Sequence, residues 1–117
     1  MIGKLARIIL FVENMAEVTA FYRDILGLSP IESEEFKPED WIEFDTGGCS
    51  IALHKASKPG GKTRNKFVFF HDDPMKVREE LIEKGVKMFK PMTGKGLVLC
   101  DGEVPEGNRF QISNRIS

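Results

Sequence analysis

The sequence predicts an α+β fold in which two copies of one βαβββ unit form a curved mixed sheet around a cleft. Two amphipathic helices each follow one strand and precede several short strands. Residues in caps, turns and strands also recur 59 positions apart, which is typical of a duplicated unit. The recurring positions are Asn14 and Asp73, Gly48 and Gly107, and Ile51-Ala52-Leu53 and Phe110-Gln111-Ile112. We therefore expect two repeats, at about 5–54 and 66–113, within a single domain that spans 1–117.

The first repeat begins with a strand over 6–12, which is rich in β-branched and aromatic residues. Asn14 is a candidate helix cap, and Glu17 three residues later completes a capping-box pattern. The helix that follows carries one apolar stripe and ends at Gly27. Further strands are predicted over 30–36, 41–45 and 49–54.

The second repeat follows a basic, glycine-containing linker over 55–65. A strand over 66–71 precedes a helix that is capped by Asp73, begins with Pro74 and ends at Gly85. The remaining strands are predicted over 86–91, 97–100 and 110–112.

The composition is that of an ordinary globular protein. The 117 residues fit one domain, and a net charge of −1 gives no basic field for nucleic acid or an anionic membrane. The longest apolar run near the N-terminus, 8–12, is too short for a membrane span and lacks the layout of a signal peptide. Cys49 and Cys100 are far apart in the sequence and are expected to be reduced. The cytoplasm is therefore the expected compartment.

Two segments resemble the vicinal oxygen chelate (VOC) superfamily, which includes glyoxalase I, extradiol dioxygenases, fosfomycin-resistance enzymes and bleomycin-binding proteins. Ile9-Leu10-Phe11-Val12-Glu13-Asn14, followed by Ala20-Phe21-Tyr22-Arg23-Asp24-Ile25-Leu26-Gly27-Leu28, is similar to the family's first strand and its FYxxxLGL helix. Pro105-Glu106-Gly107-Asn108-Arg109-Phe110-Gln111-Ile112 is similar to its DPxGNxxEL turn and last strand. The resemblance covers essentially the whole chain and implies the glyoxalase/bleomycin-resistance/dihydroxybiphenyl-dioxygenase fold. It also implies a homodimer, which would cover strand edges left exposed in a lone chain.

The family holds a divalent metal with His, Glu or Gln side chains from four strands, and the resemblance assigns these places here to Arg7, Ala52, Lys66 and Gln111. Arginine has no lone pair to donate, lysine must first lose its proton and alanine has no ligand atom, so only Gln111 offers an oxygen. A transition metal needs three or four N, O or S ligands. We therefore expect no metal cofactor, with a site rebuilt from His54, Glu43 and Gln111 as the alternative.

Arg7 and Lys66 have two compatible interpretations. They form ion pairs with Glu43 that fill the vacated site, because a buried charge is costly without a partner. Alternatively, they present fixed donors to an anionic or carbonyl ligand. His54 is expected on the cleft wall, and His71 is expected to have a structural role.

The family resemblance leaves three function classes open, because the family contains lyases, oxygenases, transferases and binders. The first is a metal-independent protein that binds a small molecule in a cleft of mixed apolar and polar groups. The second is a glyoxalase-like lyase or isomerase that uses a divalent metal, or Arg7 and Lys66 in its place, with Glu43 as the catalytic base. The third is an assembly partner with a filled cleft. The candidate ligand-binding residues are Arg7, Phe11, Trp41, Glu43, His54, Lys66, Phe70 and Gln111.

Overall fold

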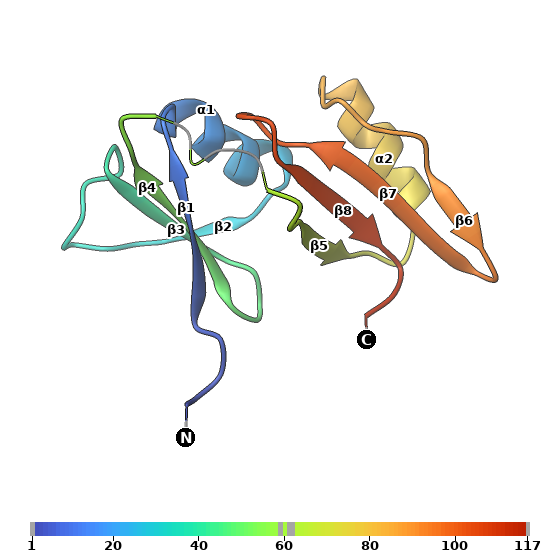
Figure 1. Ribbon diagram of the computed structural model, residues 1–117, viewed down its shortest axis with the longest axis horizontal. Coiled ribbons are helices and arrows are strands. Elements are labelled where there is room, and N and C mark those ends of the chain that lie inside the picture. Colours follow the sequence, from blue (N-terminus) through green and yellow to red (C-terminus); the bar gives the residue numbers. More distant parts are fainter. Residues whose placement is uncertain (1, 59, 61–62, 117) are drawn as a thin grey trace. The chain divides into compact units, whose positions relative to one another are not determined.

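Two compact units make up the chain, Met1–Gly61 and Lys62–Ser117. The computed structural model describes residues 2–58, 60 and 63–116. Each unit contains one four-stranded mixed sheet and a helical segment between its first and second strands (Figure 1). The predicted α+β fold of two βαβββ units is therefore confirmed, and the predicted repeat bounds lie inside the two units.

The first unit contains β1 (Arg7–Val12), α1 (Met15–Ala20), a π-helical turn η1 (Phe21–Ile25), β2 (Ser29–Ile31), β3 (Trp41–Asp45) and β4 (Ser50–Lys55). The predicted cap forms, because the side chain of Asn14 accepts a hydrogen bond from the Glu17 amide at 3.1 Å. The helix widens after α1, where the Leu26 amide donates to the Phe21 carbonyl five residues earlier at 2.9 Å. The sheet order is β1-β4-β3-β2, and β1 runs parallel to β4.

The core of the first unit lies between this helix and one face of the sheet. Val18 and Tyr22 from the helical segment, Phe44 from β3 and Leu53 from β4 are all fully buried. The rings of Tyr22 and Phe44 are 5.9 Å apart. Burial raises the pKa of the Tyr22 phenol, which therefore stays protonated at neutral pH. The helix thus covers one face of the sheet.

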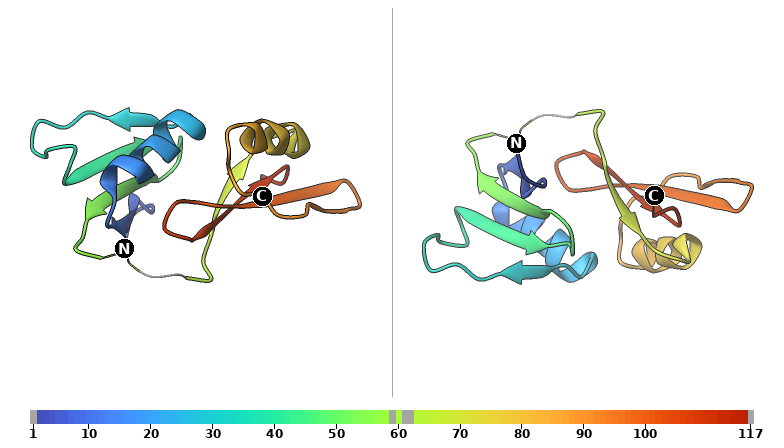
Figure 2. Two further views of the ribbon diagram at one scale, coloured as in Figure 1. Left: turned by 90° about the horizontal axis from the view of Figure 1, so that it is seen from above. Right: turned by 90° about the horizontal axis from the view of Figure 1, so that it is seen from below.

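The second unit contains β5 (Phe67–Phe70), α2 (Pro74–Glu83), β6 (Met92–Gly94), β7 (Leu97–Glu103) and β8 (Arg109–Ser113). The side chain of Asp73 caps α2 by accepting from the Lys76 amide at 3.3 Å. The sheet order is β5-β8-β7-β6, and β5 runs parallel to β8. The helix α2 lies against β7 and β8, on one face of the sheet (Figure 2). Leu81, Cys100 and Phe110 are buried between them.

Two predicted strands differ from the structure. The strand predicted over 86–91 is wrong: in its place the described chain forms an isolated bridge between Met88 and Gly102, and β6 begins only at Met92. Pro91 has no N–H to donate to a ladder, which explains the interruption before β6. The strand predicted over 30–36 is shortened to β2, and 32–37 continues without regular pairing.

The strand register preserves the internal repeat. Ile9 pairs with Ala52, and Val68 pairs with Gln111, so the partners in both parallel ladders are 43 residues apart. Ala52 and Gln111 therefore hold equivalent places in the two units.

The hairpins next to these ladders differ by one residue. Glu43 lies opposite Ala52, whereas Asp101 lies opposite Gln111. The repeat offset of 59 residues makes Gly102 the counterpart of Glu43. The turn between β7 and β8 is, however, one residue longer than the turn between β3 and β4, which shifts the pairing by one residue. Asp101 therefore occupies the place of Glu43 in the second unit.

Candidate functional site

The face of each sheet that points away from its helix is open. Strand alternation places seven of the eight predicted ligand-binding residues on these open faces, and Lys66, just before β5, reaches the second one through its contact with Asp101. The first open face carries Arg7, Phe11, Trp41, Glu43 and His54, and the second carries Lys66, Phe70 and Gln111. Large apolar side chains are exposed there, with Phe11 at 53% and Phe70 at 51%. Such exposed apolar area is typical of a surface that meets a ligand or partner.

Three of these residues join Phe36 in an aromatic patch on the first open face. The His54 ring lies 5.3 Å from that of Phe11 and 5.8 Å from that of Trp41. The Trp41 ring lies 5.5 Å from that of Phe36. His54 Nδ1 is 2.9 Å from the Lys55 carbonyl, so Nδ1 carries a proton and donates to that oxygen. The sequence does not indicate that Phe36 belongs to this patch, because Phe36 lies at the end of the strand predicted over 30–36, and the observed strand β2 ends at Ile31.

An ion pair stands beside this patch. Arg7 Nε lies 3.3 Å from Glu43 Oε2, and the Ser50 hydroxyl donates to the same oxygen. The Glu43 side chain is 19% exposed and that of Arg7 is 48% exposed, so the pair is half-buried on its acidic side. The predicted pairing of Arg7 with Glu43 is present, and it joins β1 to β3 across β4.

The second open face carries an equivalent pair with a different carboxylate. Lys66 Nζ lies 2.8 Å from Asp101 Oδ2, and Gln111 Nε2 donates to Asp101 Oδ1 at 2.9 Å. Arg109 is 4.0 Å from the same carboxylate. Burial favours a higher pKa for Asp101, but the hydrogen bonds from Lys66 and Gln111 and the charges of Lys66 and Arg109 outweigh it and lower the pKa. Asp101 is therefore ionised at neutral pH.

Lys66 thus pairs with Asp101, whereas the sequence suggested Glu43 as its partner. Asp101 was missed because the predicted strand ended at Cys100. Continuing the alternation of Leu97 and Leu99 by one step would have placed Asp101 on the same face.

The residues at the family's metal positions do not fit a divalent metal. Arg7 and Lys66 are cations that already contact carboxylates, and Ala52 has no ligand atom. The Gln111 amide nitrogen is directed at Asp101. Within the described ranges, no three side chains of His, Cys, Asp or Glu lie close enough together to hold a metal ion. The alternative set of His54, Glu43 and Gln111 draws on both units, and Glu43 is already bonded to Arg7 and Ser50.

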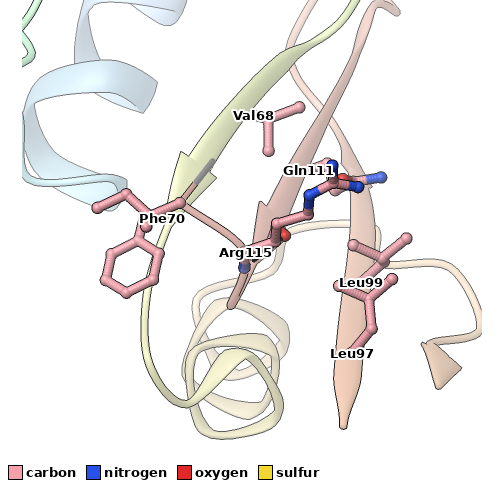
Figure 3. Close-up of a pocket in the computed structure, with 8 residues that line it drawn as sticks. Val68, Phe70, Leu97, Leu99, Gln111 and Arg115 are labelled. Atoms are coloured by element: carbon pink, nitrogen blue, oxygen red, sulfur yellow. Dashed lines mark hydrogen bonds between the residues drawn. The ribbon is translucent and has the colours of Figure 1, made fainter. Parts of the chain in front are cut away.

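A pocket of about 420 Å³ lies on the second open face (Figure 3). Phe70 and Gln111, both predicted site residues, line it together with Leu97, Leu99 and Arg115. The lining mixes apolar side chains with the polar side chains of Gln111, Ser113 and Arg115. Arg115 was missed because it follows the last predicted strand, where the sequence pattern carries no orientation signal.

His71 follows β5 and contacts the start of α2, which is compatible with a structural role. Its Nδ1 accepts from the Asp73 amide at 2.9 Å, at the start of α2. In the part of the chain that the structure describes, no helix has the length and apolar character needed to cross a membrane.

Comparison with known proteins gives the family. The sequence profile of the Glyoxalase/Bleomycin resistance protein/Dioxygenase superfamily matches residues 4–112. No match was found among curated proteins. Three solved structures are similar over nearly the whole chain. One is a glyoxalase/bleomycin resistance protein/dioxygenase family enzyme from Burkholderia phytofirmans PsJN, with 20% identity, TM-score 0.78 and coverage of 95% of this chain and 98% of that one.

The second is the fosfomycin resistance protein FosX from Mesorhizobium loti, with 15% identity, TM-score 0.77 and coverage of 98% and 94%. The third is a lactoylglutathione lyase from Agrobacterium tumefaciens, with 17% identity, TM-score 0.75 and coverage of 96% and 93%. At these identities the likeness shows the fold alone. With a profile match that spans nearly all of its length, the chain belongs to the Glyoxalase/Bleomycin resistance protein/Dioxygenase superfamily.

Proposed function

We propose that this chain binds a small anionic or carbonyl compound on its open sheet faces, and that it does so without a divalent metal. The proposed ligand-binding residues are Arg7, Phe11, Trp41, Glu43, His54, Lys66, Phe70 and Gln111. The observation that carries the proposal is the pair of cation–carboxylate contacts, Arg7 with Glu43 and Lys66 with Asp101, next to the family's metal positions. At either position a dication would meet a fixed positive charge and lack the necessary donors.

The ion pairs leave donors for a ligand. Arg7 contacts Glu43 through Nε, so a ligand oxygen has the two Nη groups of the guanidinium to bind, and Lys66 has three N–H bonds of which Asp101 takes one. Because each cation is held by a carboxylate, its donors are oriented before the ligand arrives. Charge-assisted hydrogen bonds from such donors favour carboxylate or carbonyl oxygens.

The aromatic patch supports a ligand with a flat apolar part. Aromatic rings on an open face bind planar groups by offset or edge-to-face contact. His54 adds one polar group at the centre of the patch, at Nε2. A small organic ligand with a flat body and a polar oxygen therefore fits the first open face better than an inorganic ion.

We also propose a homodimer in the cytoplasm. In each unit the outer strands of the sheet, β1 and β2 or β5 and β6, have a neighbour within the unit on one side only. Such edges and the exposed apolar faces are the surfaces that association covers. Light scattering at micromolar concentration measures the mass, and a monomer under these conditions argues against the dimer.

The proposal is tested with protein stripped of metal by a chelator. We expect elemental analysis of untreated protein to find no stoichiometric transition metal, and nickel, zinc or manganese to leave the melting temperature unchanged, because a metal that binds only the folded state must raise it. Small carboxylates and carbonyl compounds are then screened by thermal shift. Arg7→Ala and Lys66→Ala should each weaken any hit several-fold, whereas Arg23→Ala, at an exposed arginine paired with Asp24, should not.

Two results contradict the proposal. One equivalent of tightly bound metal, with lyase activity that appears on metal addition, would establish the metal-dependent enzyme instead. A screen without hits on the chelator-treated protein, together with a clear loss of stability in both alanine variants, would make the ion pairs purely structural.

A further inference from the structure

The pocket on the second open face contains an amide group whose orientation the neighbouring ion pair fixes. Gln111 Nε2 donates to Asp101 Oδ1 at 2.9 Å, and Asp101 also accepts from Lys66 Nζ at 2.8 Å. An ionised carboxylate accepts hydrogen bonds and cannot donate them, so the Gln111 amide must turn its nitrogen toward Asp101. The amide therefore cannot turn over to place its oxygen against Asp101.

This arrangement leaves Gln111 Oε1 for a ligand. Oε1 has no hydrogen-bond partner among the described residues, although Gln111 as a whole is only 9% exposed. Every fully buried side-chain nitrogen or oxygen of the described residues has a partner, so Oε1 must be reached from outside the protein. Because Gln111 lines the pocket (Figure 3), a molecule in the pocket can meet this oxygen. An amide oxygen only accepts, and it therefore selects a ligand that donates an N–H or O–H.

Ser113 offers the complementary group two residues further along β8. Strand alternation places Ser113 and Gln111 on the same face, and both line the pocket. The Ser113 hydroxyl oxygen accepts from the Arg115 backbone amide at 3.0 Å, and its O–H is not donated to any described residue. The hydroxyl proton is therefore left to donate to a ligand carbonyl.

We infer that this pocket binds an apolar carboxamide, whose N–H donates to Gln111 Oε1 and whose carbonyl accepts from the Ser113 hydroxyl. Its hydrocarbon part lies on the apolar side chains of Val68, Leu97 and Leu99. The inference rests on the proposed function, from whose two ligand classes it selects the carbonyl compounds, and it makes Gln111 the specificity-determining residue.

The chemistry of the pocket distinguishes a carboxamide from its close relatives. A ketone leaves Gln111 Oε1 without a donor, and a carboxylate sets an oxygen without a proton against it, which is costly at a largely buried residue. The volume of about 420 Å³ lies in the range of small-molecule sites and suits one aromatic ring with a short polar chain.

The test compares hydrocinnamide with two probes of nearly equal size, benzylacetone and hydrocinnamate. Benzylacetone keeps the carbonyl and replaces the amide nitrogen by a methyl group, and hydrocinnamate replaces it by a negatively charged oxygen. Amide chemical shifts of the whole chain, stripped of metal, are followed by NMR during titration. The spectra also show whether each variant is folded.

The variants remove one part of the site at a time. Gln111→Met replaces the amide by an apolar group of similar length, Asp101→Asn releases the amide because asparagine can also donate, and Ser113→Ala removes the hydroxyl. Ser33→Ala is the matched control, because the Ser33 hydroxyl also accepts from a backbone amide, that of Glu35 at 3.2 Å, but belongs to the first unit.

We expect wild type and Ser33→Ala to bind the amide about five-fold more tightly than the ketone or the acid, with shifts centred on β7 and β8. Gln111→Met should bind amide and ketone about equally, and Asp101→Asn should lie between. Ser113→Ala should weaken amide and ketone alike, because both present a carbonyl.

Four results would overturn the inference. They are a ketone or acid that binds wild type as tightly as the amide, an amide preference that survives Gln111→Met, unchanged affinities in Ser113→Ala, and shifts confined to the first unit.

The outcomes also separate the inference from the proposed function. If hydrocinnamide does not bind, but other carboxylates or carbonyl compounds bind metal-free protein in a way that Arg7→Ala and Lys66→Ala weaken, only the inference falls. If none of the compounds binds, both fall.

Discussion

Removing the ammonium group of Lys66 measures what the second ion pair contributes to stability. The contact with Asp101 is short, at 2.8 Å, and a hydrogen bond between charged groups is worth about 1.5–3 kcal/mol when shielded from water. The Lys66 side chain is 37% exposed, so solvent screens the pair and a coupling free energy of about 1 kcal/mol is expected. The Arg7–Glu43 pair is longer and more exposed, which predicts a coupling of about 0.5 kcal/mol.

The assay is a pair of double-mutant cycles, Lys66→Met with Asp101→Asn and Arg7→Met with Glu43→Gln, each followed by urea unfolding. Thermal unfolding gives a second readout, at roughly 4 °C per kcal/mol for a chain of this size. A coupling in the second unit no larger than that in the first would refute the assignment of the stronger pair to Lys66 and Asp101.

The pH dependence gives the cycle an internal check. Because the pKa of Asp101 is lower in the folded state than in the unfolded chain, its stabilisation is complete above the unfolded value of about 3.9. It is lost as the pH falls through the lower folded value. The coupling with Lys66 should therefore be constant between neutral pH and about pH 5 and disappear toward about pH 2. If the coupling free energy between Lys66 and Asp101 persists near about pH 2, the interaction between them is not electrostatic.

Further predictions concern packing and capping. Gly102→Ala should destabilise the protein by about 1–3 kcal/mol, because the added Cβ would lie 2.5 Å from Met88 Sδ and 2.6 Å from the buried Phe110 ring. Gly94→Ala is the control, since nothing lies within 4 Å of its Cβ position, and equal losses in both variants would contradict the close packing at Gly102. Asn14→Ala should cost about 1 kcal/mol in urea unfolding through loss of the helix cap. An unchanged midpoint would mean that the cap contributes nothing.

The elements that the sequence predicted well are those with local signals. Asn14 and Asp73 mark helix starts because their side chains accept from amides only three residues away. Strand alternation puts Trp41 and Glu43 on one face of β3, and the register of β3 and β4 adds His54 to that face. The sequence likewise identified the duplicated unit, because equivalent residues recur at one offset.

Tertiary structure decided which side chains of the site contact one another. One extra residue in the turn before β8 moved Asp101, and not Gly102, opposite Gln111, and so gave Lys66 its carboxylate. Arg115 joined the pocket only because Asn114 binds β7. Caps and alternation depend on neighbours within a few positions, which the sequence displays directly. Strand register depends on the residue count of a turn and on bonds between distant segments, and therefore appears only once the chain has folded.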